Sequence, residues 1–375
     1  MRKLTQQIAR IILIVLLLYL FLVSISLMSH SFKCFGKEFS KNLIATTSNP
    51  FIGLFIGVLA TSIIQSSSTT TSIIVGFVAG GALSIRCAIP IIMGANIGTT
   101  VTNTLVALGH ITRKEEFKRA FSSSTMHDLF NMLNVIIFFP LEMSTHILER
   151  TATFIASFLE HSGGFKLMSP VKVIVKPAVN AIDYLFMNFM KIPEKVAGIL
   201  MLVVSLIVLV LSLVFLVKVM KNIIANKTEI VFDKILSRSG LISLSMGCLF
   251  TAIVQSSSVT TSLLVPLVGS GVLRLETAYP IVLGANLGTT VTAILASLTG
   301  NIAGITIAIV HLLFNLCGVL IFYPIKAIRT IPITLAKSLA SAISEKRYLA
   351  FVYVGVVFFI LPIVMIYVYN FLNRG

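Results

Sequence analysis

Two short runs of glutamine and serine carry the side chains best suited to hold a small ion. They are Gln65, Ser66, Ser67 and Ser68 in one run, and Gln255, Ser256, Ser257 and Ser258 in the other. A hydroxyl can donate a hydrogen bond to an anion's oxygen, or offer a lone pair to a sodium ion. We expect each run to lie near a helix start, where unpaired backbone N–H groups and the helix dipole favour an anion.

Each run is followed by a motif with an asparagine amide, glycines and further hydroxyls. It reads Gly-Ala-Asn-Ile-Gly-Thr-Thr-Val-Thr at 94–102 and Gly-Ala-Asn-Leu-Gly-Thr-Thr-Val-Thr at 284–292. Without gaps, 28 of the 53 positions in 57–109 are identical to those in 247–299, so the chain contains an internal duplication. The glycines would let backbone approach a ligand closely, and unwound carbonyls would suit a hard cation.

The composition places these polar blocks inside a membrane protein. Of the 375 residues, 57% are hydrophobic and 11% are charged, and the mean hydropathy is +1.01. Soluble chains have about 25% charged residues. The formal charge of +16 is typical of basic cytoplasmic loops that contact anionic headgroups, so it does not indicate nucleic-acid binding. The four cysteines form no CxxC pair, and no nucleophile–base set, P-loop or metal-ligand cluster indicates an enzyme.

Apolar runs predict the helices that position the polar blocks. Single spans are expected at 11–28, 120–141, 196–217, 302–324 and 349–371. In the first copy, a lead-in span over 51–64 would precede a re-entrant hairpin over 65–89, which is too polar and glycine-rich to cross alone. Residues 91–108 would then cross as a helix broken at 94–102.

Lysine and arginine set the orientation. With the N-terminus in the cytoplasm, the segments 1–10, 112–119, 218–238 and 326–347 are cytoplasmic and hold 17 of the 29 Lys and Arg. Repeat one then begins on the inside and repeat two on the outside. The expected fold is an all-α integral membrane protein with two inverted-topology repeats, each with a re-entrant helical hairpin and a broken transmembrane helix. This pattern predicts a secondary transporter with its site at the repeat interface.

The chain divides into six expected segments. They are an N-terminal span and lead-in (1–50), repeat 1 (51–141), an extracytoplasmic amphipathic loop (142–195), a span with a basic cytoplasmic linker (196–238), repeat 2 (239–325), and a basic cytoplasmic segment with the C-terminal span (326–375).

Two facing polar blocks would form a cage of neutral donors and acceptors, which fits a small oxyanion together with sodium ions. The residues expected to bind the oxyanion are Gln65, Ser66, Ser67, Ser68, Asn96, Gln255, Ser256, Ser257, Ser258 and Asn286. The residues expected to bind sodium are Gln65, Ser68, Thr71, Asn96, Thr99, Thr100, Gln255, Ser258, Thr261, Asn286, Thr289 and Thr290. No catalytic residue and no cofactor is expected, and Na+ is the only metal.

The alternative is that these blocks serve only helix packing, because Ser, Thr and Gly also line ordinary contacts between helices in membranes. The repetition of both blocks, glutamine and asparagine included, favours a binding site.

Charged and titratable residues near the blocks are weaker candidates. Arg86, Arg274 and Glu276 are expected at hairpin ends near the interface. His127 and His311 recur in the two closing spans, as packing histidines or as a proton relay. Asp128 has Leu312 as its counterpart, and is either a single-copy group for charge coupling or a near-surface acid.

At these residues the chain resembles the type II sodium/phosphate cotransporter family. The resemblance rests on the doubled Gln-Ser-Ser-Ser run, on Gly-Ala-Asn-Ile-Gly-Thr-Thr-Val-Thr-Asn-Thr at 94–104, and on His-Asp-Leu-Phe-Asn at 127–131. It covers roughly residues 45–345 and implies sodium-driven uptake of inorganic phosphate at the two doubled motifs. The loop 142–195 is short and lacks cysteine, unlike that of the animal members, which suggests a bacterial protein.

The sequence therefore predicts a Na+/phosphate symporter in the cell (inner) membrane, with inorganic phosphate, sodium ions and membrane lipids as partners. A homodimer is left open. One alternative is a sodium-coupled carrier of another oxyanion, because a neutral cage does not by itself exclude sulfate, arsenate or a carboxylate. The other is an ion channel, which inverted repeats and hairpins also build.

Overall fold

The computed structural model describes residues 2–36, 49–161, 165–224 and 239–372, and every element in these ranges is a helix. The first half of the chain contains α1 (Arg2–Cys34), α3 (Pro50–Ile64), α4 (Ser67–Ala79), α5 (Ile85–Gly98), α6 (Val101–Leu108), α7 (Lys114–Thr145), α8 (Ile147–His161), α9 (Phe165–Tyr184) and η1 (Leu185–Phe189). The second half contains α10 (Glu194–Ile224), α12 (Gly240–Val254), α13 (Ser257–Gly269), α14 (Leu275–Ser297), α15 (Ile302–Phe322), α16 (Lys326–Glu345), α17 (Leu349–Gly355), η3 (Val356–Ile360) and α18 (Leu361–Leu372). Residues 37–48 of the expected lead-in and 225–238 of the expected basic linker lie outside the described residues.

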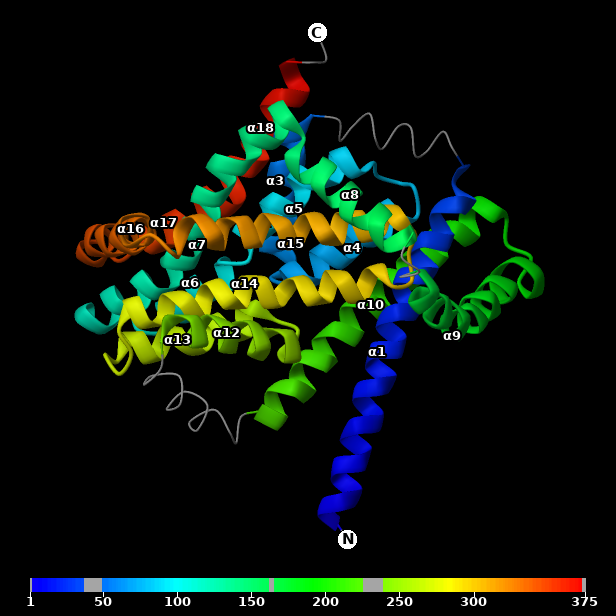
Figure 1. Cartoon of the computed structure of the whole chain (residues 1–375), viewed down its shortest axis with the longest axis horizontal. Coiled ribbons are helices and arrows are strands. Elements are labelled where there is room, and N and C mark those ends of the chain that lie inside the picture. Colours follow the sequence, from blue (N-terminus) through cyan, green and yellow to red (C-terminus); the bar gives the residue numbers. More distant parts are fainter. Residues whose placement is uncertain (1, 37–48, 162–164, 225–238, 373–375) are drawn as a thin grey trace.

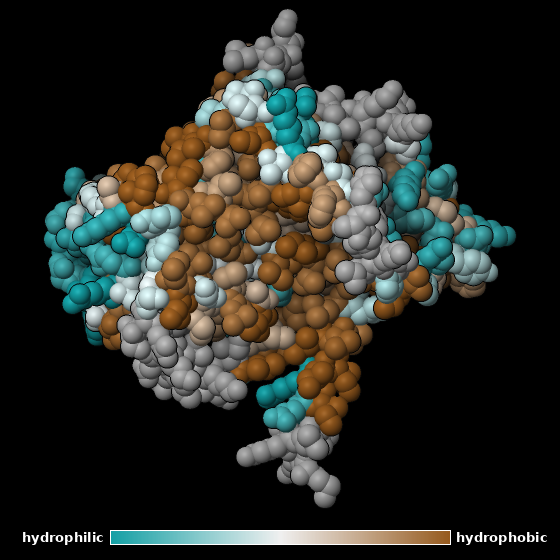
Figure 2. Space-filling model, in the orientation of Figure 1, coloured by the Kyte–Doolittle hydropathy of each residue, from teal (hydrophilic) through white to brown (hydrophobic). Residues whose placement is uncertain are grey.

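Six described helical stretches, two of which join consecutive elements, are long and apolar enough to cross a membrane. They are Gln7–Cys34, Ile85–Leu108, Glu194–Ile223, Leu275–Ser297, Ile302–Phe322 and Leu349–Tyr369. The pair α7 and α8, bent by 73°, would be a seventh if it forms one span. Figure 2 shows an apolar belt over the middle of the molecule, with hydrophilic residues gathered at two opposite ends near α16 and α9 (Figure 1). The chain is therefore a multi-pass membrane protein whose described elements are all helices.

The glutamine–serine runs lie at the turn between two short helices in each copy. α3 and α12 have 15 residues each, and α4 and α13 have 13 each, whereas a single-helix span needs about 20. The expectation of a span over 51–64 is therefore wrong. The helix pair that carries the first turn runs from Pro50 to Ala79 rather than over 65–89.

Each turn is formed by a left-handed glutamine followed by a serine that caps the next helix. Gln65 ends α3 and Gln255 ends α12 in the left-handed conformation, with φ of 57° and 60°. The next residue, Ser66 or Ser256, is extended, and its side-chain oxygen caps the following helix. A non-glycine residue at positive φ is uncommon. Because Gln65 and Gln255 both adopt it at the same motif position, this backbone conformation is a shared feature of the two turns.

The Gly-Ala-Asn motif breaks a helix in the first copy only. Thr99 and Thr100 separate α5 from α6, inside the expected interruption at 94–102. α14 runs without a break through 284–292, so the expectation of a second broken helix is wrong. The hydroxyls of Thr289 and Thr290 bond to carbonyls of their own helix, as those of Thr99 and Thr100 do, so these bonds are the same in the broken and the unbroken copy.

The motif's glycines serve helix packing rather than ligand approach. A Cβ added at Gly284 would lie 1.9 Å from the backbone oxygen of Leu244 in α12, and one at Gly94 would lie 2.0 Å from that of Leu54 in α3. α14 therefore packs backbone to backbone on α12, as α5 does on α3. The close contact, and not an unwound ligand loop, explains why glycine stands at these positions.

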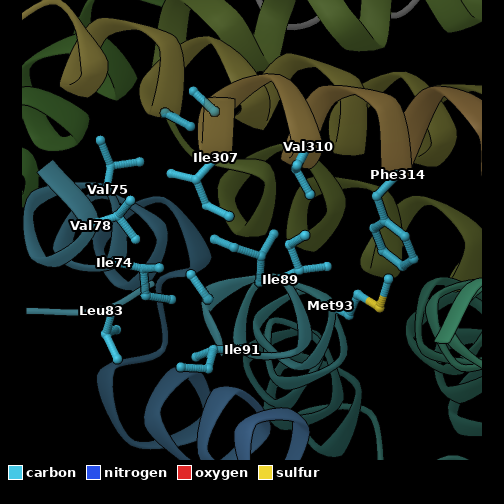
Figure 3. Close-up of a cluster of buried hydrophobic side chains, with 14 of the residues drawn as sticks. Ile74, Val75, Val78, Leu83, Ile89, Ile91, Met93, Ile307, Val310 and Phe314 are labelled. Carbon is cyan, nitrogen blue, oxygen red and sulfur yellow. The ribbon is translucent and has the colours of Figure 1, made fainter. Parts of the chain in front are cut away.

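The two copies interlock. α4 of the first copy packs against α14 and α15, and α13 of the second packs against α6 and α7. Figure 3 shows the apolar side of one such junction, where Val75 from α4, Ile89 and Met93 from α5, and Ile307 and Phe314 from α15 converge. This buried cluster fixes the position of the first turn relative to the second copy.

Candidate functional site

The two turns meet in space although 190 positions separate them in the chain. Ser68 donates its hydroxyl to the backbone oxygen of Gln255 at 3.1 Å. Thr292 donates to the side-chain oxygen Oε1 of Gln255 at 2.8 Å, and its Oγ1 lies 3.5 Å from Ser68 Oγ. The structure therefore brings together the two runs that the sequence singled out.

A cavity of about 210 Å³ lies beside the two turns. Its polar lining consists of Gln65, Ser66, Thr69, Gln255 and Ser256. Its apolar lining consists of Ile64, Val210, Leu213, Val214 and Val217. No charged side chain lines it among the residues that the structure describes, so the cavity is a neutral, partly apolar space.

Two helix N-termini border this cavity. Ser66 Oγ accepts a hydrogen bond from the backbone N–H of Thr69 at 3.2 Å, and Ser256 Oγ accepts one from that of Val259 at 3.3 Å. These bonds fix the first turns of α4 and α13, whose remaining N–H groups and positive dipole ends favour an anion. Ser67, Ser68, Ser257 and Ser258 are buried within the same first turns.

The two glutamines differ in how they are held. Gln255 is buried, and its amide nitrogen donates to the backbone oxygen of Ala252 while its Oε1 accepts from Thr292. Gln65 is exposed at the cavity wall. The cavity therefore has one fixed and one accessible amide.

The asparagines of the Gly-Ala-Asn motifs lie away from the cavity lining. Asn286 joins a buried network in which its Oδ1 lies 2.6 Å from His127 Nε2 and its Nδ2 donates to Asn131 Oδ1 at 2.7 Å. Asn131 in turn donates to the backbone oxygen of Asn96 at 3.0 Å. The amide nitrogen of Asn96 bonds to the Ile92 carbonyl of its own helix.

The same network fixes the tautomer of His127. Nε2 faces the amide oxygen of Asn286, so it carries the proton. Nδ1 lies 3.4 Å from Asn103 Nδ2 and accepts there. Thr261 donates to Asn103 Oδ1 at 2.9 Å, which extends the network into α13. The packing interpretation of His127 fits this geometry.

The remaining expected sodium ligands are not gathered at one point. The hydroxyls of Thr99, Thr100, Thr289 and Thr290 each bond to a carbonyl three or four residues earlier in the chain. They are buried, but they do not line the cavity beside the turns.

The charged candidates lie at the ends of the helices. Arg86 bonds to Glu149 at 3.2 Å, and Lys337 bonds to Glu276 at 2.5 Å, both at exposed positions. Arg274 lines a different cavity. Near α16, Lys114 lies 2.7 Å from Glu345 and holds the pKa of that carboxyl below its ordinary value. None of these side chains reaches the turns within the described ranges.

Asp128 is fully buried rather than near the surface, which corrects the near-surface interpretation. Its Oδ2 accepts a hydrogen bond from the hydroxyl of Tyr353, and its Oδ1 has no partner in the part of the chain that the structure describes. A buried acidic residue in a membrane protein is a candidate functional residue.

Sequence reasoning missed Thr292, Asn103 and Tyr353. Thr292 belongs to the repeated motif, so its repetition with Thr102 was a usable signal. Asn103 lies in the stretch 94–104 that carries the family resemblance, which was a usable signal, although its counterpart is Ala293. No pattern marks Tyr353, which is identified only by its contact with Asp128.

Comparison with known proteins gives the chain relatives over most of its length. The family model described as "Na+/Pi-cotransporter" matches residues 20–162 and 206–361. Sodium-dependent phosphate transport protein 2B of Homo sapiens is 34% identical over 96% of this chain and 65% of its own length. Protein 2A of Oryctolagus cuniculus is 34% identical over 96% of this chain and 68% of its own length, and protein 2A of Rattus norvegicus is 34% identical over 92% and 65%.

The chain thus spans about 65% of the length of the 2B relatives. No solved structure matches it. The family match extends through both helix pairs and both Gly-Ala-Asn motifs, and on this ground the chain belongs to the Na+/Pi-cotransporter family.

Proposed function

We propose that this protein is a symporter that couples the entry of sodium ions to the import of inorganic phosphate across the cell (inner) membrane. The observation that carries the proposal is the meeting of the two glutamine–serine turns at one neutral cavity. The family membership and the names of the relatives, sodium-dependent phosphate transport proteins, support it.

Phosphate would bind between the turns, to the amides and hydroxyls named from the sequence. At the turns, the residues proposed for phosphate are Gln65, Ser66, Ser67, Ser68, Gln255, Ser256, Ser257 and Ser258. Asn96 and Asn286, which the sequence also indicated, lie away from the cavity lining and are not proposed for this position. Two helix N-termini supply partial positive charge there. Unpaired negative charge is costly in a water-poor site, and no cation lines this cavity among the described residues, so a counter-ion is required.

Sodium supplies that counter-ion. At the turns, the residues proposed for sodium are Gln65, Ser68, Gln255 and Ser258. The other residues that the sequence indicated for sodium do not line this cavity, namely Thr71, Asn96, Thr99, Thr100, Thr261, Asn286, Thr289 and Thr290. Coupling follows because each ion stabilises the other in the site and neither is stable there alone. The polar blocks of the two copies would re-enter the membrane as inverted hairpins and expose the site to each side in turn.

Radiolabelled phosphate uptake into proteoliposomes tests the proposal. An inward sodium gradient should drive saturable uptake, and the same gradient of choline should not. Excess sulfate that abolishes the uptake would favour a carrier of another oxyanion. Uptake that is indifferent to sodium and does not saturate would contradict the symporter and favour a channel.

A further inference from the structure

A second cavity lies where α9 packs against α1, away from the glutamine–serine turns (Figure 1). Its walls come from α1, α9, the end of α4 and the turn before α15. Its volume is about 360 Å³, and it shares no lining residue with the cavity beside the turns. Small-molecule sites occupy about 300–1,000 Å³, so this cavity is large enough to hold a ligand.

The charged side chains that line this cavity are basic, and we call it the basic cavity. Lys33 comes from α1, and Lys172 and Lys176 lie one turn apart on α9. No carboxylate lines the cavity among the residues that the structure describes. Ammonium groups gathered around one cavity repel one another, and an anion among them would relieve that repulsion.

A histidine in the lining engages a carboxylate that lies outside it. His30 lines the basic cavity, and its Nε2 donates to Asp183 Oδ1 of α9 at 2.9 Å. Asp183 does not line the cavity itself. The pairing leaves the lysines as the charges that face the ligand space.

The start of α15 adds partial positive charge. Asn301 lines the cavity and caps this 21-residue helix, because its Oδ1 accepts from the backbone N–H of Gly304 at 3.1 Å. Its Nδ2 donates to the backbone oxygen of Ala79, the last residue of α4, at 3.1 Å. The positive end of the α15 dipole therefore meets the cavity, and the carbonyl of Ala79, which would repel an anion, is occupied.

Two serines of α1 supply hydroxyls that the protein does not use. Ser24 and Ser31 donate to carbonyls of their own helix at 2.6 and 2.7 Å. Ser26 and Ser29 line the cavity, are half-buried, and make no hydrogen bond to another described residue. Their hydroxyls can donate to the oxygens of a bound anion.

We propose that the basic cavity binds a phosphate group, which is either free inorganic phosphate or the phosphate of an anionic lipid headgroup. Ammonium groups, hydroxyls and a helix N-terminus are the donors that phosphate oxygens accept in proteins. The site supplies its own positive charge, so it needs no sodium. It is separate from the site at the turns and goes beyond the proposed transport function.

The position of the cavity gives both sources access. α9 belongs to the segment 142–195, which the sequence predicts to be extracytoplasmic. Along α4, the cavity at Ala79 lies about 18 Å from the turn at Ser67, so free phosphate attracted by the lysines would collect one helix length from the neutral site. On α9, Val173 and Ile174 are 66% and 60% exposed beside the lysines, as in a helix that lies on a lipid surface.

Equilibrium binding of radiolabelled inorganic phosphate to the purified full-length protein tests the first source. The buffer is choline chloride at low ionic strength, without sodium, and the detergent is uncharged. Saturable binding is expected. Lys33→Gln combined with Lys176→Gln should raise the Kd about tenfold, since each part-exposed charge contributes a few-fold.

The matched control combines Lys191→Gln with Lys195→Gln. Both lysines are exposed, they lie between η1 and the first turn of α10, and neither lines the basic cavity. The control changes the net charge by the same amount, so it should leave the Kd unchanged.

Native mass spectrometry of the same proteins, titrated with phosphatidylglycerol, tests the second source. If the lipid headgroup is the ligand, the wild type and the control should retain this lipid and the Lys33→Gln/Lys176→Gln protein should lose it. A diacylglycerol, which has no phosphate, should not be retained at this site by any of them. Retention that differs between the lysine pairs identifies the lipid, and radiolabelled phosphate binding that differs between them identifies free phosphate.

A Lys33→Gln/Lys176→Gln protein that matches the control in both measurements would overturn the proposal. Gln255→Ala should leave sodium-free phosphate binding unchanged, and its loss in that variant would assign the binding to the turns and overturn the proposal as well. If the lysine pair controls binding but vesicles show no sodium-driven phosphate uptake, the basic cavity stands and the proposed transport function fails.

Discussion

Thr292 holds the side-chain oxygen of Gln255 through a hydrogen bond of 2.8 Å, although the two residues lie 37 positions apart. Their counterparts in the first copy are not joined in this way. Thr102 Oγ1 has no partner among the described residues, and Gln65 is exposed at the cavity. Two turns of identical sequence therefore differ in how firmly their amides are held.

Thr292→Val should weaken phosphate binding because it releases the amide of Gln255 from its fixed orientation. One such hydrogen bond contributes about 1 kcal/mol, so the KM for phosphate should rise roughly fivefold. Thr102→Val is the matched control and should change KM little, because no protein partner is lost within the described residues. Equal effects of the two variants on uptake would contradict the proposed asymmetry.

Gln65→Ala and Gln255→Ala should each reduce sodium-driven phosphate uptake by at least about tenfold, since each removes an amide at the site. Their effects on stability should differ. Gln255→Ala also removes the oxygen to which the Thr292 hydroxyl donates, so it should lower the melting temperature, whereas Gln65→Ala should not. Uptake at the wild-type rate in a Gln65→Ala protein that inserts normally would remove this residue from the site.

Gly284→Ala should destabilise the fold, because its Cβ would lie 1.9 Å from the backbone oxygen of Leu244 and force α14 away from α12. The expected loss is about 1–3 kcal/mol or more, as for an overpacked core. Gly355→Ala is the control, since a Cβ there would meet nothing within 4 Å. Melting temperatures in detergent compare the two, and equal values would show that the helix contact is not tight.

Tyr353→Phe should destabilise the protein by removing the hydroxyl that bonds to Asp128. Both carboxylate oxygens of a fully buried group would then lack a partner in the described chain, which costs about 1–3 kcal/mol. Tyr348→Phe, at a residue that is 61% exposed, should leave the melting temperature unchanged. A Tyr353→Phe protein as stable as this control would mean that the Asp128 contact contributes nothing.

The sequence predicted the polar centre because both copies repeat it. Gln65 and Gln255 were paired by identity alone, and a duplicated motif in a membrane protein points to a shared interface. The all-helical membrane fold followed from composition in the same way. The placement of the turns at one cavity agrees with that expectation.

What the sequence could not predict depends on contacts between distant residues. The prediction of a membrane span over 51–64 was wrong because α3 ends at Gln65 after only 15 residues. Counting apolar residues does not predict the left-handed conformation of Gln65 that ends this helix. The break at Thr99 and Thr100 has no equivalent in α14, although both copies share the motif, the bond of its first threonine to its own helix and the glycine packing, so the motif alone does not predict which copy breaks. The bond between His127 and Asn286 joins the two copies across 159 positions of the chain, so no local sequence pattern predicts it.

Coupling between the two ions is the central claim, and one measurement tests it most directly. Vesicles that contain the protein are given an inward phosphate gradient with equal sodium on both sides, and the entry of radiolabelled sodium is followed. The account predicts that phosphate drives sodium above its equilibrium level, and that Gln65→Ala abolishes this accumulation. Sodium entry that is the same with and without phosphate would contradict symport.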